Sequence, residues 1–77
     1  MQINEDETAV LRAIADLVDT APHGVPNEDD VARWASIAHD EVVEIMRYLE
    51  SRGLIKVLFP TVTLGGVTIT DLGRRHL

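Results

Sequence analysis

The stretch from Val31 to Ile55, VARWASIAHDEVVEIMRYLESRGLI, decides the fold of this 77-residue chain. Its apolar residues recur at helical spacing on both sides of Ser36–Ala38, which predicts a helix of about two turns, a tight turn and a longer helix over about 39–52. Gly53 then stands where a left-handed residue commonly ends a helix. We expect one face of the longer helix to be buried, through the apolar stripe Val42, Ile45, Met46 and Leu49.

The N-terminal part of the chain predicts a further amphipathic helix over residues 5–19. Asn4, with Glu7 three positions later, is a capping-box signal at its start. Asn27 is a second cap signal, directly before the short helix of the quoted stretch. Proline and glycine between residues 21 and 26 predict a loop that joins the two helices. The apolar stripe expected on the first helix is Val10, Leu11, Ile14, Leu17 and Val18.

The hydrophobic period changes after the longer helix. Residues 54–59 form a β-branched and aromatic run, which predicts a strand. Residues 67–70 alternate apolar and polar side chains, as a half-buried return strand does. Gly65-Gly66 is the expected tight bend between them. A last short helical segment should close the chain, and we expect Gly73 to interrupt it.

Composition excludes several classes of protein. Hydrophobic residues make up 45% and charged residues 26% of the chain, the balance of a single globular domain over residues 1–77. The chain has no cysteine, which excludes disulfides and thiolate zinc sites. It has no apolar run of the roughly 18 residues that a membrane span needs, and its N-terminus is acidic where a signal peptide would be basic. We therefore expect a cytoplasmic protein without membrane contact.

Charge is unevenly distributed along the sequence. The formal net charge is −6. Residues 1–46 contain eleven acidic and only two basic residues, whereas residues 47–77 contain five basic and two acidic ones. Residues 57–70 carry no charge at all. Because nucleic acids are polyanions, this balance disfavours general binding to them and places any favourable contact in the C-terminal part.

Two segments resemble the winged helix-turn-helix domain of small bacterial and archaeal transcription regulators of the MarR and PadR kind. One is the quoted stretch, including residues 49–55 where the longer helix ends and the first strand begins. The other is the C-terminal segment Ile69–Arg74. The resemblance implies a mainly α fold, in which three helices and a small antiparallel β-hairpin form a core with a wing. It also implies a non-enzymatic, DNA-binding regulator that acts as a dimer and has no cofactor.

In such domains the second helix of the motif enters the major groove, so 39–52 would be the recognition helix. If the protein binds DNA, we expect the contacts to come from His39, Arg47, Ser51 and Arg52, with Arg74 and Arg75 on nearby phosphates. Double-stranded DNA is thus one expected partner, although the net charge disfavours it.

The sequence departs from the DNA-binding pattern in two places. Asp40, Glu41 and Glu44 stand on the outward face of the expected recognition helix. A carboxylate about 6 Å from a phosphate costs roughly 1–3 kcal/mol. The wing carries no cation and several apolar residues, which suits a protein surface better than a phosphate backbone. The alternative is therefore a protein-interaction winged helix that forms a homodimer or binds another protein through Val43, Tyr48, Phe59, Val62 and Leu64.

Other residues favour structural roles over chemistry. We expect Trp34 to complete the core, since it follows Val31 by three; the alternative is an exposed anchor for a partner. The acidic run at 28–30 matches a helix start, and the three histidines lie far apart in no ligand motif, so we expect no metal site. No nucleophile has a neighbouring base, and we expect no catalytic residues.

Overall fold

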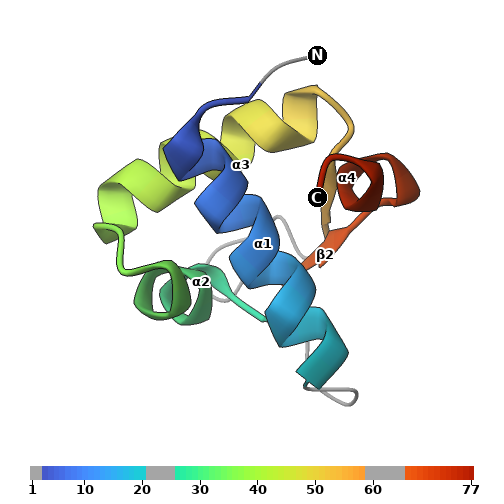
Figure 1. Cartoon of the computed structure of the whole chain (residues 1–77). Helices are drawn as coiled ribbons and strands as arrows, with labels where there is room; N and C mark the ends of the chain where they lie inside the picture. Colours follow the sequence, from blue (N-terminus) through green and yellow to red (C-terminus); the bar gives the residue numbers. More distant parts are fainter. Residues whose placement is uncertain (1–2, 21–25, 59–65) are drawn as a thin grey trace.

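The computed structural model describes residues 3–20, 26–58 and 66–77 of the chain. Figure 1 shows three helices around a common centre, with a small two-stranded sheet and a short C-terminal helix beside them. In chain order the elements are α1 (Glu5–Thr20), α2 (Glu28–Ala35), α3 (His39–Ser51), β1 (Ile55–Val57), β2 (Val67–Ile69) and α4 (Asp71–Arg75). This order is the one that the sequence predicts.

The predicted capping box at Asn4 and the predicted cap at Asn27 are both present, and they set where α1 and α2 begin. The backbone N–H of Glu7 donates to Oδ1 of Asn4 at 2.7 Å, and the N–H of Asn4 donates to Oε1 of Glu7 at 2.9 Å. Asn27 and Asp30 make the same reciprocal pair, at 2.9 and 3.2 Å. Each box satisfies N–H groups that have no partner within their helix.

The turn between α2 and α3 depends on one left-handed residue. Ser36 ends α2 with φ 58°, and Ala38 precedes α3 without a side-chain cap. At the other end of α3, Gly53 has φ 76°, and its N–H donates to the carbonyl of Glu50 at 2.9 Å. The predicted turn and the predicted glycine stop are therefore confirmed, with α3 ending at Ser51.

The two strands pair antiparallel, as the sequence predicts, but they are shorter than the predicted runs. Ile55 lies opposite Ile69, and Val57 lies opposite Val67. The N–H of Leu58 extends the ladder by donating to the carbonyl of Gly66 at 2.7 Å. The remaining residues of the expected bend and wing, 59–65, lie outside the described residues.

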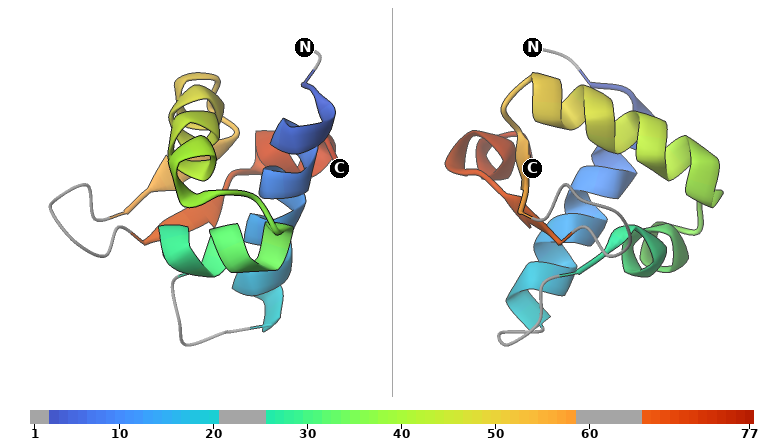
Figure 2. Two further views of the ribbon diagram at one scale, coloured as in Figure 1. Left: turned by 90° about the vertical axis from the view of Figure 1, so that its left-hand side faces the viewer. Right: turned by 180° about the vertical axis from the view of Figure 1, so that it is seen from behind.

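The hydrophobic core lies where α1, α2, α3 and the sheet meet. In Figure 2 the sheet lies between α3 on one side and α1 and α4 on the other. Three residues of the predicted stripes, Leu17, Val18 and Ile45, are only partly buried. The fully buried large side chains come from all four of these parts and are Val10, Leu11, Ile14, Val31, Val42, Leu49, Leu54 and Val67.

The expectation that Trp34 belongs to the core is wrong. The residue is 54% exposed. The inward side of α2 is formed by Val31, which is buried, and by Ala32 and Ala35, which are half-buried. With 3.6 residues per turn, position 34 lies outside the sector that positions 31, 32 and 35 define. The indole is therefore left at the edge of α2.

The expectation that Gly73 interrupts the last helix is also wrong, because α4 runs through it. Gly73 is buried, and a Cβ at this position would run into the carbonyl oxygen of Leu54 and lie 2.7 Å from Cγ1 of Ile69. Thr70 caps α4 by accepting the N–H of Gly73, and its hydroxyl also lies 2.6 Å from the carbonyl oxygen of Gly53. Glycine thus allows α4 to pack directly on the backbone at the start of β1.

Candidate nucleic-acid interface

The outward face of α3 is the surface on which a winged-helix domain would read DNA. Val42, Met46 and Leu49 turn toward the core, Ile45 and Tyr48 pack beside them, and every other residue of α3 except the half-buried Val43 is exposed. Figure 2 shows α3 along one side of the molecule. The predicted recognition helix is thus a surface helix with one buried stripe.

Acidic side chains predominate on this face. The exposed acidic residues of α3 are Asp40, Glu41, Glu44 and Glu50, and Arg47 is its single arginine or lysine. Arg47 is exposed and lies on the C-terminal half of the helix. Arg52 follows directly as the C-cap residue. Positive charge is therefore confined to the C-terminal end of α3.

His39 begins α3 and is held by two carboxylates of α2. Its Nε2 lies 3.3 Å from Oδ1 of Asp29 and 3.5 Å from Oε2 of Glu28. The imidazole side chain is 48% exposed, so it remains accessible. These contacts tie the first turns of α2 and α3 together, and a DNA contact through Nε2 of His39 would have to replace them.

The C-terminal end of α3 holds its polar groups in a fixed arrangement. Cζ of Arg52 lies 5.4 Å from the centre of the Tyr48 ring, within the range of a cation–π interaction. The hydroxyl of Ser51 donates to the carbonyl of Tyr48 at 2.6 Å, which leaves its oxygen lone pairs as acceptors. Arg52 and Arg47 are thus the cations that this end of α3 can offer to a phosphate.

Arg74 is held by a carboxylate of α1. Nη2 of Arg74 lies 2.8 Å from Oδ1 of Asp19, and Nη1 lies 3.3 Å from the other carboxylate oxygen. This bidentate pair joins α4, which also carries Arg75, to the end of α1. The start of α4 lies beside the C-terminal end of α3, because the hydroxyl of its N-cap residue Thr70 lies 2.6 Å from the carbonyl oxygen of Gly53. A contact between Arg74 and a phosphate would have to compete with Asp19.

The Arg74 ion pair gives the domain a pH-dependent contact. The hydrogen bonds from Arg74 hold the pKa of Asp19 below its ordinary value of 3.8, and the pair is solvent-exposed. A lowered folded-state pKa stabilises the folded chain above the unfolded-state pKa, and this contribution is lost as the pH falls through the folded value.

We therefore expect Asp19→Asn to lower the midpoint of thermal unfolding slightly at pH 6, since exposed pairs are weak. Below the folded pKa of Asp19 the variant and the parent chain should unfold at the same temperature. Scanning calorimetry at the two pH values checks this. A difference that persisted unchanged in acid would show that Asp19 acts through something other than its charge.

The residues predicted for protein contacts are only partly described. Val43 is half-buried on α3, and Tyr48 is half-buried with its side chain packed against the core. Phe59, Val62 and Leu64 lie outside the described residues. Among the described residues, no three His, Asp or Glu side chains gather as a metal site, and no helix is long and apolar enough to cross a membrane.

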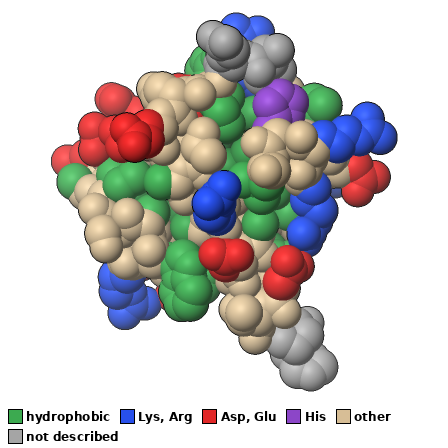
Figure 3. All heavy atoms as spheres, viewed as in Figure 1, with side chains coloured by type: hydrophobic (Ala, Val, Ile, Leu, Met, Phe, Trp, Pro, Cys, Tyr) green, Lys and Arg blue, Asp and Glu red, His purple; other side chains and the backbone are tan. Residues whose placement is uncertain are grey.

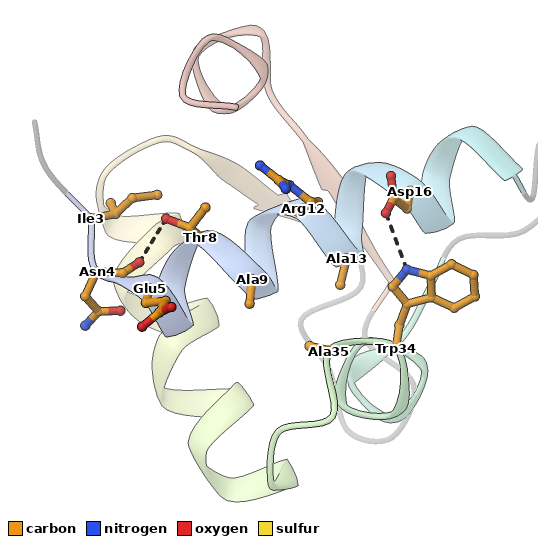
Figure 4. A pocket seen from close by; sticks show the side chains of 10 residues that line it. All are labelled: Ile3, Asn4, Glu5, Thr8, Ala9, Arg12, Ala13, Asp16, Trp34 and Ala35. Atoms are coloured by element: carbon orange, nitrogen blue, oxygen red, sulfur yellow. Dashed lines mark hydrogen bonds between the residues drawn. The ribbon is translucent and has the colours of Figure 1, made fainter.

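A groove between α1 and α2 is a surface that the sequence did not point to. It has a volume of about 590 Å³ and extends from Ile3 to Trp34. Figure 4 shows Ala9, Ala13 and Ala35 between these two residues. The alternative interpretation of Trp34 as an exposed residue was the only sequence signal for this groove.

Solved structures share this fold at low sequence identity. A candidate DNA-binding protein of Ralstonia eutropha JMP134 superposes with a TM-score of 0.79 at 16% identity, covering 96% of this chain and 91% of that protein. MepR, a transcription regulator of the Staphylococcus aureus multidrug efflux pump MepA, gives 0.75 at 16% identity. NMB1585, a MarR family regulator from Neisseria meningitidis, gives 0.69 at 18% identity and covers 96% of this chain.

The present chain has the winged helix-turn-helix fold of these regulators, which confirms the predicted fold class. It spans about half the length of two of them, 53% of MepR and 49% of NMB1585. No family model and no curated protein sequence matches it.

Proposed function

We propose that this protein is a non-enzymatic transcription regulator that binds double-stranded DNA as a dimer, with α3 as its recognition helix. The observation that carries the proposal is the uncovered outward face of α3 in a fold shared with transcription regulators. In helix-turn-helix proteins this helix lies in the major groove while the preceding helix crosses the backbone.

The distribution of charge on α3 defines how the helix would contact DNA. Arg47 and Arg52 at its C-terminal end supply phosphate or guanine contacts, and the Ser51 oxygen accepts a hydrogen bond. The carboxylates at its N-terminal end accept from cytosine N4 but repel phosphates. One copy therefore has few favourable phosphate contacts, and two copies on half-sites one DNA turn apart would supply twice as many.

We expect Arg47→Glu to weaken DNA binding by about 10-fold or more at 50 mM salt, because it replaces a phosphate contact by a repulsive charge. Fluorescence anisotropy with a labelled mixed-sequence duplex measures this. For the parent chain, affinity should fall steeply as salt is raised. Conversely, Glu44→Gln should strengthen binding, since it removes a carboxylate one turn before Arg47.

Arg12→Glu is the matched control. It makes the same change of charge at an exposed position of α1, which is neither the recognition helix nor the helix that crosses the backbone. Binding should change much less in this variant. Equal losses in Arg47→Glu and Arg12→Glu would show that only net charge matters, and absence of any binding at about 50 mM salt would remove DNA as the partner.

The excess of carboxylates on α3 favours a second candidate function, in which this face binds another protein. Four exposed acidic residues accompany one arginine on the helix. Val43 lies half-buried among them and would be the apolar centre of the interface. In that case the chain would form a dimer or a complex without DNA, and Val43→Asp would dissociate it in analytical ultracentrifugation.

A further inference from the structure

The groove between α1 and α2 combines an apolar floor with an aromatic wall. Ala9, Ala13 and Ala35 line the floor, where their small side chains let another backbone approach closely. Trp34 forms the wall at one end and is 54% exposed. Exposed tryptophan at the edge of an apolar groove is typical of the residues that dominate protein interfaces.

Trp34 is also held in place. Its Nε1 lies 3.5 Å from Oδ2 of Asp16 on α1, a long contact that the sticks of Figure 4 show across the end of the groove. A second, smaller hollow of about 220 Å³, lined by Leu17, Asp30 and Arg33, lies against the same indole. Both hollows therefore meet at Trp34, each with a carboxylate beside it.

The surroundings of the groove are acidic. The described parts of α1 and α2 and their flanks, residues 3–20 and 26–35, contain eight acidic residues and only two arginines. Arg33 is paired with Asp30, and Arg12 lines the groove together with Glu5 and Asp16, so that the charged lining residues carry a net charge of −1 (Figure 4). Figure 3 shows hydrophobic side chains exposed on this side of the molecule, with acidic side chains beside them.

We propose that this groove binds a basic amphipathic helix of a partner protein. The apolar side of that helix would pack on Ala9, Ala13 and Trp34, and its lysines or arginines would face Glu5 and Asp16. The groove follows α1 from Glu5 to Asp16, about 16 Å at 1.5 Å per residue, which accommodates about three turns of a helix.

Charge argues against two other occupants of this groove, a second copy of the chain and a nucleic acid. A second copy of the chain that docked through its own α1 and α2 would bring carboxylates against an equally acidic surface. A phosphate backbone would be repelled for the same reason. The groove also lies between α1 and α2, whereas α3 lies on another side of the molecule in Figure 2. Its occupation is therefore separable from the proposed binding of DNA to α3.

The test is a titration of the full chain with a 14-residue Leu/Lys peptide of helical periodicity. Trp34 is the only tryptophan, so its emission reports directly on the groove. We expect saturable binding and a shift of the emission to shorter wavelength. The same peptide with glutamate in place of lysine should not bind, and neither should a sequence that scrambles the apolar periodicity.

Variants separate docking from general attraction between opposite charges. With a fluorescein-labelled peptide, Trp34→Ala should weaken binding about 10-fold or more, whereas Leu72→Ala, which removes another exposed apolar side chain, should leave it unchanged. Asp16→Asn should weaken binding more than Glu41→Gln, the same change of charge on α3. Equal effects within either pair, an unshifted emission, or self-association that buries Trp34 without peptide would overturn the proposal.

Discussion

Gly73→Ala should destabilise the domain by about 3 kcal/mol or more, as severe overpacking against a rigid neighbour does. The added Cβ would meet the carbonyl oxygen of Leu54, and the start of β1 cannot move without disturbing the sheet. The same Cβ would also lie only 2.7 Å from Cγ1 of Ile69. Urea denaturation followed by circular dichroism measures the loss.

Gly53→Ala is the control for this prediction. Gly53 has φ 76°, but a Cβ there meets nothing closer than a Leu72 methyl carbon at 4.0 Å. Its replacement should cost about 1 kcal/mol, the strain of a left-handed alanine. If Gly53→Ala were the more damaging of the two, the direct packing of α4 on the Leu54 backbone would be wrong.

Leu49→Ala is the second change with a large expected effect. Leu49 is fully buried on the inward stripe of α3, so its truncation removes apolar contacts and leaves a cavity. Such substitutions cost about 2–5 kcal/mol. A domain of this size has a total stability of only about 4–12 kcal/mol, and we therefore expect a large drop in the urea midpoint.

Trp34→Ala gives the matched comparison. The indole is larger than a leucine side chain, but it is 54% exposed and lies outside the core. Its removal should cost only about 1 kcal/mol, in proportion to the apolar area that it buries. A larger loss for Trp34→Ala than for Leu49→Ala would restore the original prediction that Trp34 completes the core.

Local signals in the sequence were sufficient to predict most of the fold. Asn4 and Asn27 mark helix starts because each cap needs only residues three positions away. Gly53 marks the end of α3 because left-handed geometry is a local property. The antiparallel pairing of the strands followed from the change in hydrophobic period.

Features that depend on tertiary packing could not be predicted. The side of α2 that turns inward depends on the packing of α2 against α1 and α3, and Trp34 remains 54% exposed. Gly73 resembled a helix breaker because its contact with Leu54 is invisible in the sequence.

In the candidate site, too, features set by local spacing could be predicted, whereas features set by tertiary packing could not. The carboxylates on the outward face of α3 follow from helical spacing alone, whereas the ion pair of Arg74 with Asp19 joins residues 55 positions apart. That pair holds Arg74 on a carboxylate of α1.

Chemical-shift mapping of the 15N-labelled chain with an unlabelled DNA duplex at about 50 mM salt, where phosphate contacts are strong, tests the proposed role of α3 most directly. We predict that the amide shifts concentrate on the exposed residues of α3, above all Arg47, Ser51 and the adjacent Arg52. Shifts concentrated on α4 or along the groove between α1 and α2, with α3 unchanged, would contradict the account.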